Sequence, residues 1–271
     1  VVIVEKLQEK VLAAPPMDGR DIALTHLSIE ILKELDVWRR FPARAISPIK
    51  EARVLDGQSP YFLLFDHNDT DKTALGYIVS NHLIRKALCE SLEDFANIRL
   101  ITDVTAEAVS TDTTRGSGRV SNGQTITALL IVAADSRFSE VRRKMGISAA
   151  MNDFGRVVIV CRMKHDRPHD DIAYECFHYK RTLAVLPLGG NTSSVVVTLP
   201  ADMSEALMAM DKNAFNTDIQ HRFGDRLGRM ELVGKRYLYP LVGVHANRFA
   251  AQRFALIGDA AVGMHPVTAH G

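Results

Sequence analysis

The sequence contains little cysteine, little net charge and no long apolar run. Its 271 residues include three cysteines, Cys89, Cys161 and Cys176, which form no CxxC pair. We therefore expect reduced thiols in a cytoplasmic protein rather than a disulfide framework. No apolar stretch approaches the roughly 20 residues that a membrane-spanning helix needs. A formal net charge of +1 gives no electrostatic argument for a nucleic-acid partner.

Both ends of the sequence lack a segment that their neighbours lead us to expect. Val1–Glu5 has the pattern of a short buried strand with an acid at its carboxyl end. In dinucleotide-binding units such an acid binds ribose hydroxyls, about 20 residues after a glycine-rich phosphate loop. That loop is not in the sequence, and no residues remain for a helix after the closing Gly258-Asp259 motif. We therefore expect an internal piece of a longer protein that is inactive alone.

Residue spacing predicts an α/β fold with an inserted antiparallel sheet. Thr25–Leu35 has helical apolar spacing, and Asn81–Phe95 is a predicted helix with Asn81 as its N-cap. After Met151 come four β segments joined by polar turns, and then a predicted helix over Met203–Gly224. This order is typical of a dinucleotide-binding, Rossmann-like layer interrupted by an antiparallel substrate layer. We predict a cofactor domain of residues 1–151 and 248–271 and a substrate-binding domain of residues 152–247.

Two further motifs follow apolar strands. The strand Ala128–Ala134 leads to Asp135 and Ser136, and a helix containing Arg142 comes next. Helix starts and arginines favour anions, so phosphate contact is one interpretation, and capping of the helix by Asp135 or Ser136 is the other. The later motif, Gly258-Asp259, suits close backbone approach to a ligand, with the carboxylate binding a hydroxyl.

The ordered set of these motifs resembles the group A flavoprotein aromatic hydroxylases, and within them the ubiquinone-biosynthesis hydroxylases. In that family Ala-Asp-Gly-x-x-Ser-x-Val-Arg precedes the substrate sheet, and Gly-Asp-Ala-Ala-His-x-x-His-Pro-x-x-Gly-Gln-Gly follows it. The corresponding segments here are Ala134-Asp-Ser-Arg-Phe-Ser-Glu-Val-Arg142 and Gly258-Asp-Ala-Ala-Val-Gly-Met-His-Pro266. Arg226–Pro240 and Leu183–Gly189 are also similar to the ubiquinone subgroup. The resemblance extends over essentially the whole chain.

The resemblance implies roles for individual residues. The implied FAD contacts are Glu5 on the adenosine ribose, Arg20 at the phosphate–ribityl region, Asn81, Asp135 with Arg142 at the pyrophosphate, and Gly258 with Asp259 on the ribityl chain. Pro266 would lie at the reactive face of the flavin, with His265 and His270 beside it. The chain departs from the family at Ser136, in place of glycine, at Val262, in place of histidine, and at Thr268-Ala269-His270, in place of Ala-Gly-Gln. The details of the catalytic face therefore stay open.

The resemblance also implies an activity, which is hydroxylation of a polyprenyl phenol or quinol by an FAD-dependent monooxygenase with NAD(P)H and O2. The substrate tail implies transient membrane contact, and other ubiquinone-biosynthesis proteins are implied partners. The alternatives are a flavoprotein of the same fold with other chemistry, such as a halogenase or a prenyl reductase, and a flavin-free binding fragment. The single tryptophan, Trp38, disfavours the halogenase.

Two other site types have little support in the sequence. His165, His169 and His178 fit no zinc spacing, so we predict no metal site and a solvated hairpin over residues 165–171. Ser193-Ser194 lies in a strand-like segment without a nucleophile elbow, which argues against a serine hydrolase.

Overall fold

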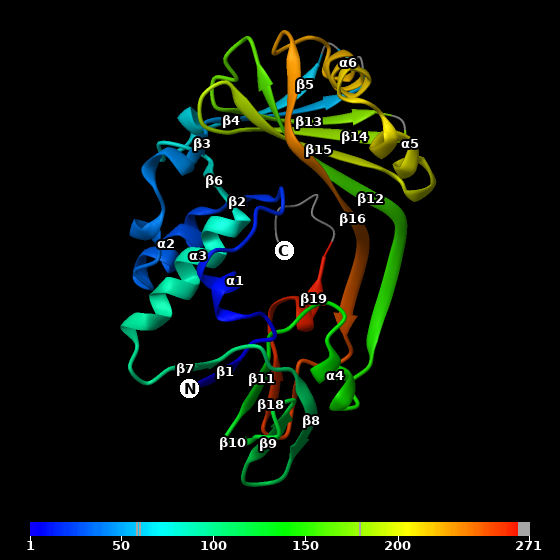
Figure 1. The fold of residues 1–271 in the computed structure, drawn as a ribbon. Helices are drawn as coiled ribbons and strands as arrows, with labels where there is room; N and C mark the ends of the chain where they lie inside the picture. The colour runs from blue at the N-terminus through cyan, green and yellow to red at the C-terminus, as the bar shows by residue number, and fades with distance from the viewer. Residues whose placement is uncertain (58, 60, 179, 265–271) are drawn as a thin grey trace. The chain divides into compact units, whose positions relative to one another are not determined.

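A computed structural model describes residues 1–57, 59, 61–178 and 180–264 (Figure 1). These residues form two compact units, each built from segments that lie apart in the sequence. The first unit contains Val1–Leu12, Phe95–Phe154 and the chain from Leu241 on, and the second contains Ala13–Asp94 and Gly155–Pro240. Residues 13–94 belong to the second unit, although the predicted cofactor domain includes them. The assignment of a cofactor domain and a substrate domain stays a prediction.

The first unit is built from short strands in small sheets. Its elements are β1 (Val2–Val4), α1 (Glu9–Ala13), β7 (Arg99–Ile101), β8 (Ala106–Thr111), β9 (Gly116–Val120), β10 (Thr125–Ala128), β11 (Ile131–Ala133), α4 (Glu140–Lys144), β17 (Ala250–Ala251), β18 (Phe254–Leu256) and β19 (Val262–Gly263). β1 and β7 are parallel, β8–β10 form an antiparallel sheet, and β18 pairs with β11 and β17.

The pairing of β11 with β18 places the two motifs together. The strands are parallel, with Ile131 opposite Phe254 and Ala133 opposite Leu256. Phe254 and Leu256 are buried in a small core with Ala133 and Ile147. Because parallel strands end at the same edge of a sheet, the segments that begin with Asp135 and Gly258 are neighbours.

The second unit contains most of a large mixed sheet and a small antiparallel sheet. Its strands are β2 (Asp21–Leu24), β3 (Ser47–Ile49), β4 (Glu51–Asp56), β5 (Phe62–Asp66), β6 (Gly76–Ser80), β13 (Ile172–His178), β14 (Arg181–Pro187) and β15 (Thr192–Pro200). β12 (Ala149–His165) and β16 (Met230–Ala246) each belong partly to both units. The large sheet has the order β19-β16-β12-β15-β14-β13-β4-β5, and β2-β6-β3 form the small one.

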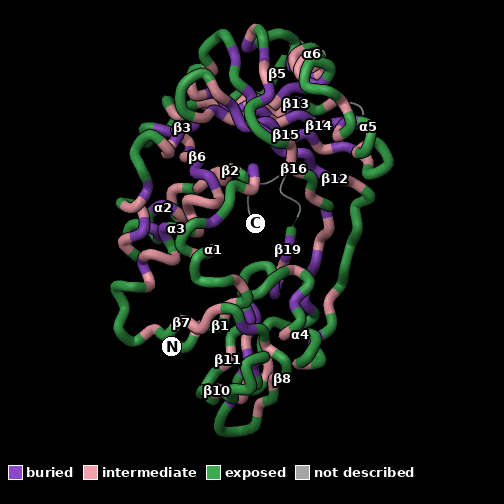
Figure 2. Tube along the Cα trace, viewed as in Figure 1, coloured by how far each residue is buried: buried purple, intermediate pink, exposed green. Residues whose placement is uncertain are grey.

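The large sheet confirms the predicted antiparallel pattern for β12–β15 and extends it. β14 pairs antiparallel with β13 and β15, and its side chains alternate between buried and half-buried. Figure 2 shows how buried positions gather on these central strands. β4 joins β13 in parallel, so the sheet is mixed and continues outside the predicted insertion to the edge strand β5.

Two predictions about helices need correction. The segment predicted as one helix over Met203–Gly224 forms α5 (Ser204–Ala209) and α6 (Lys212–Arg222). The chain turns at Met210, and the Asp211 side chain accepts a hydrogen bond from Ala214 N, which starts the second helix.

The other correction concerns Asn81. It is the first residue of α3 (Asn81–Ser91) and not its N-cap, a position that Ser80 holds. Its side-chain amide donates instead to Asp18. The predicted helix after Thr25 is confirmed as α2 (His26–Glu34), with the Thr25 hydroxyl accepting from Ser28 N.

Candidate functional site

In the first unit, buried Arg142 fastens the two motif segments to each other. Its Nη1 donates to the carbonyl oxygens of Arg137, at 3.2 Å, and Ala260, at 2.9 Å. The residue is 3% exposed, and its Nε is buried without a hydrogen-bond partner among the described residues. One guanidinium therefore fixes the backbone beside both Asp135 and Asp259.

Two side chains accept hydrogen bonds at the start of the short helix α4, those of Asp135 and of the N-cap residue Ser139. Asp135 Oδ2 accepts from Glu140 N at 3.0 Å, while Ser139 Oγ accepts from Arg142 N at 3.0 Å. These bonds use backbone donors at the helix start. The N-cap is therefore Ser139, and the prediction that Asp135 or Ser136 holds this position was wrong, although the Asp135 carboxylate does accept from a backbone N–H of the first turn. Contact between Asp135 and a pyrophosphate stays a prediction.

Asp259 offers a carboxylate at the surface of the same edge. Its side chain is 50% exposed, and Oδ2 lies 3.6 Å from Nη2 of Arg137. Arg137 Nη1 donates to Val242 O at 3.2 Å, so the guanidinium is anchored on β16. Gly258 has a φ of +56°, and a Cβ there would meet no atom within 4 Å. Open space and a partly exposed carboxylate thus lie side by side on this turn.

Glu5 presents a second carboxylate in the first unit, at the end of β1. Its backbone N donates to Ile101 O at 2.9 Å, which continues the parallel pairing. Its Oε1 accepts from Leu7 N at 2.8 Å. Among the described residues no partner is found for the other carboxylate oxygen, which is left to accept a hydroxyl.

In the second unit, Arg20 and Asn81 meet at Asp18. Arg20 Nη2 and Asn81 Nδ2 donate to Asp18 Oδ2 at 2.6 and 2.7 Å. Tyr239 donates to Asp18 O at 2.6 Å, and the Arg20 guanidinium lies over its ring. Partial burial raises the pKa of Asp18, but the hydrogen bonds from Arg20 and Asn81 outweigh it, and the pKa is lowered. The two predicted cofactor residues are thus held by one ionised carboxylate.

A buried ion pair supports the same strands of the second unit. Arg162 on β12 donates through Nη2 to Asp21 Oδ1 and Ser80 Oγ, both at 2.6 Å. The Asp21 side chain is fully buried. Burial and the Arg162 cation lower the pKa of the neighbouring His82. These contacts fix the ends of β2 and β6, from which Arg20 and Asn81 project.

Comparison with known proteins now decides the family. A model of the FAD binding domain matches residues 1–271. The chain belongs to this FAD-binding family. Ubiquinone hydroxylase UbiM of Neisseria meningitidis is 44% identical over 275 residues, which cover all of this chain and 60% of that protein. Ubiquinone hydroxylase UbiL of Rhodospirillum rubrum is 35% identical over 271 residues, which cover all of this chain and 63% of that protein.

These matches confirm the predicted resemblance to the ubiquinone hydroxylases, and the chain spans less than two thirds of the length of either relative. The fold is confirmed by a solved structure, PqsL of Pseudomonas aeruginosa, described as a probable FAD-dependent monooxygenase. It matches with a TM-score of 0.77 at 18% identity, over all of this chain and 74% of that one. At this identity the likeness shows the α/β fold alone.

The first unit of this FAD-binding chain has groups that suit the cofactor. FAD carries hydroxyls on its ribose and ribityl chains and a negative diphosphate. Within the part of the chain that the structure describes, Asp259 and Glu5 each leave a carboxylate oxygen to accept from a hydroxyl, and Gly258 leaves room beside Asp259. Arg137 provides positive charge at the same edge. The donor and acceptor set therefore fits FAD.

Three predicted site residues have no described position, and two residues of the site were not predicted. His265, Pro266 and His270, predicted at the reactive face, lie outside the described residues. Arg137 and Asp18 were missed by the motif comparison. Arg137 occupies a position that the family motif leaves variable, and Asp18 stands two residues before Arg20, so proximity in sequence was the only signal for either.

The histidines predicted to lie in a solvated hairpin are packed instead. His165 is 5% exposed, and its Nε2 lies 3.0 Å from Oγ of fully buried Ser193. The ring of His169 packs edge-on against it. Burial lowers the pKa of His165. A serine without solvent access cannot meet a substrate, so this pair is structural. Within the described ranges, no group of three or more His, Cys, Asp or Glu is placed to hold a metal ion.

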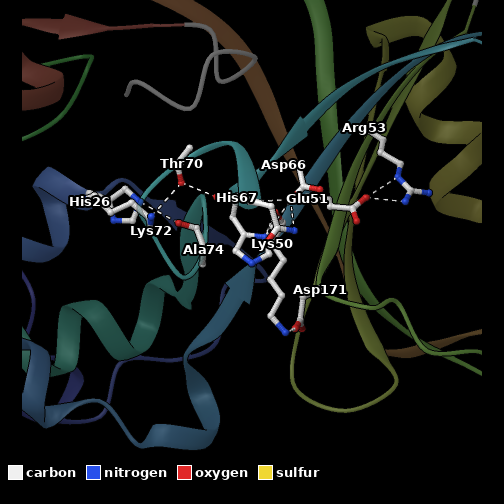
Figure 3. Close-up of polar contacts among 11 residues, drawn as sticks. His26, Lys50, Glu51, Arg53, Asp66, His67, Thr70, Lys72, Ala74 and Asp171 are labelled. Carbon is white, nitrogen blue, oxygen red and sulfur yellow. Dashed lines mark hydrogen bonds and ion pairs between the residues drawn. The ribbon is translucent and has the colours of Figure 1, made fainter.

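A further polar cluster in the second unit lies where β4, β5 and β13 meet (Figure 3). Arg53 pairs with Glu51 at 2.6 Å, and Lys50 pairs with Asp171 at 2.8 Å. The Lys50–Asp171 hydrogen bond raises the pKa of Lys50. His67 N donates to Lys50 O at 3.0 Å. These groups satisfy one another, which indicates a structural junction rather than a ligand site.

Proposed function

We propose that the protein is an FAD-dependent aromatic hydroxylase of ubiquinone biosynthesis, acting on the ring of a polyprenyl phenol or quinol. The observation that carries this proposal is the similarity, over the whole chain, to two proteins named ubiquinone hydroxylases. NAD(P)H would be the electron donor and O2 the oxygen source. When bound, FAD would supply the oxygen chemistry, and the protein would supply position and a dry environment.

The residues of the chain would act by binding and orientation. Asp259 would accept a hydrogen bond from a ribityl hydroxyl, and Glu5 from a ribose hydroxyl. Asp135 would lie near the pyrophosphate, and Arg142 would keep its loop in register with the Gly258 turn. Charge-assisted bonds of this kind are shorter and stronger than neutral ones, so few are needed.

The second unit would contribute donors with a fixed direction. Arg20 and Asn81 both donate to Asp18, which restricts their rotamers before a ligand arrives. Preorganised donors lose less entropy when a ligand binds. We therefore propose both as FAD contacts.

The decisive experiment uses the full-length protein. The purified protein should be yellow or become so on addition of FAD. With a short-chain demethoxyubiquinol analogue, NAD(P)H and 18O2, mass spectrometry should find one 18O atom in the ring product. A colourless protein that FAD cannot restore would refute the proposal. Flavin binding without an oxygenated product, or halogen incorporation when chloride is supplied, would assign other chemistry to the fold.

Membrane contact is a finer part of the proposal. Among the described residues, no helix is long and apolar enough to span a lipid bilayer. Contact would instead come through the polyprenyl tail of the substrate. Cosedimentation with neutral vesicles should increase when they contain a polyprenyl quinol, and equal binding with and without it would contradict this route. Other ubiquinone-biosynthesis proteins remain proposed partners, and crosslinking in cells would identify them.

A further inference from the structure

We infer that Arg137 is a positioning residue that orients the Asp259 carboxylate toward the flavin side chain. This inference rests on the proposed function, because it takes Asp259 as the ribityl contact. Arg137 lies in the first motif segment and Asp259 in the second, and the parallel strands β11 and β18 bring these segments together. Both residues belong to the first unit.

The main chain at both residues is fixed by the same buried cation. Arg142 Nη1 donates to the carbonyl of Arg137 itself and to that of Ala260, which follows Asp259. The path of the Arg137 side chain is also restricted by its neighbours. A Cβ on Gly263 would lie 3.3 Å from the Arg137 Cβ, so glycine allows the arginine stem to pass close to β19. Side-chain position is therefore set by backbone contacts before any ligand binds.

One nitrogen of the Arg137 guanidinium is fixed by a backbone carbonyl, and the other lies near the Asp259 carboxylate. Nη1 donates to Val242 O at 3.2 Å, and Nη2 lies 3.6 Å from Asp259 Oδ2. This second distance suits electrostatic attraction but exceeds that of a good hydrogen bond. The attraction can hold the carboxylate in one direction while its oxygens stay able to accept from hydroxyls.

Exposure of the pair indicates that its contribution is orientation rather than stability. The side chains are 32% and 50% exposed, and exposed ion pairs add little to folding free energy. Loss of the Arg137 charge should thus leave the fold intact and appear in ligand affinity. Arg143 gives a matched control, because it is on α4, is 64% exposed and pairs only weakly with Glu140, at 4.0 Å.

The test measures flavin affinity of the full-length apoprotein by fluorescence quenching, with FAD and riboflavin as probes. Arg137→Gln should weaken both flavins by about fivefold, the effect of an ion pair near 1 kcal/mol. Arg137→Lys should recover part of the loss, and Arg143→Gln should bind as wild type. The melting temperature of the apoprotein should not change. Riboflavin has the ribityl chain without the diphosphate, so an equal loss for both probes locates the effect at the ribityl side.

A double-mutant cycle separates positioning from independent binding. In an Asp259→Asn background, Arg137→Gln should cause no further loss. An undiminished second loss, or a loss for FAD alone, would overturn the inference and assign Arg137 to the diphosphate. Wild-type affinity of both Arg137 variants would also overturn it. The hydroxylation assay could fail while the effects of the Arg137 and Asp259 substitutions on flavin affinity remain coupled. That result would refute the proposed function but leave the inference about Arg137 standing.

Discussion

Arg142 Nη1 and Ala260 O are 2.9 Å apart, although 118 residues separate them in the sequence. The bond joins the loop after β11 to the turn after β18, and a second bond from the same nitrogen reaches Arg137 O. A buried charged donor of this kind is costly to remove, because the carbonyl groups it satisfied lose their partner.

Arg142→Met should therefore destabilise the protein while keeping most of the side-chain volume. We expect the free energy of unfolding to fall by about 3 kcal/mol, measured by urea denaturation. Arg143→Met, on the exposed face of the same helix, should change it by less than about 0.5 kcal/mol. Equal effects of the two substitutions would show that the carbonyl bonds contribute little.

Asp18→Asn should alter acid stability in a defined direction. The folded-state pKa of Asp18 is lowered, so its stabilising effect is complete above the unfolded-state value of about 3.9 and is lost as the pH falls through the folded value. The wild-type protein should lose more stability than Asp18→Asn between pH 4 and acid denaturation. Urea midpoints measured across this range provide the comparison. Parallel curves for the two proteins would contradict the assignment.

His165 should make the folding stability depend on pH in a higher range than Asp18 does. Burial lowers its folded-state pKa below the unfolded value of about 6.5, so the unfolded chain binds the proton more tightly. Stability should be full above that value and decrease as the pH falls toward the folded pKa. His165→Gln should reduce this slope between pH 7 and 5 in urea denaturation, and His221→Gln, on exposed helix surface, should not.

The burial of His165 could not be predicted from its neighbours in the sequence. The polar run after it predicts solvent, yet β12 continues to His165 and places the ring against Ser193, 28 residues away. Apolar runs located several strands but not their ends, because the predicted strand Ala128–Ala134 is divided between the end of β10 and the short strand β11. The proximity of Asp135 to Gly258 was not predicted, because it depends on the parallel pairing of β11 with β18. Arg137, Asp18 and the parallel β4–β13 pair could not be predicted, because each depends on partners that only the fold brings together.

The edge strand β5 should promote self-association. Residues 61–65 are Tyr-Phe-Leu-Leu-Phe and all are exposed, and among the described residues the strand pairs only with β4. An exposed apolar run on an edge strand favours pairing with another chain, and the one charged residue of β5, Asp66, stands at its end. Leu64→Lys should reduce concentration-dependent association in sedimentation velocity runs. Leu27→Lys removes a more exposed leucine from helix α2 and should have no such effect. Equal sedimentation of wild type and Leu64→Lys would exclude β5 as the contact.

Asp259→Ala in the full-length protein should weaken FAD retention. The carboxylate is half exposed beside open space at Gly258, so it would act as an acceptor for a flavin hydroxyl rather than as a structural bond. Loss of one hydrogen bond to a charged group should reduce affinity by about tenfold to a hundredfold. The flavin content after gel filtration and the FAD titration of the apoprotein measure this change. Glu107→Ala, a partly exposed acid on β8 of the same unit, provides the control. Flavin content equal to that of Glu107→Ala would remove Asp259 from the cofactor site, whereas a normal melting temperature with lost flavin would place its role in binding alone.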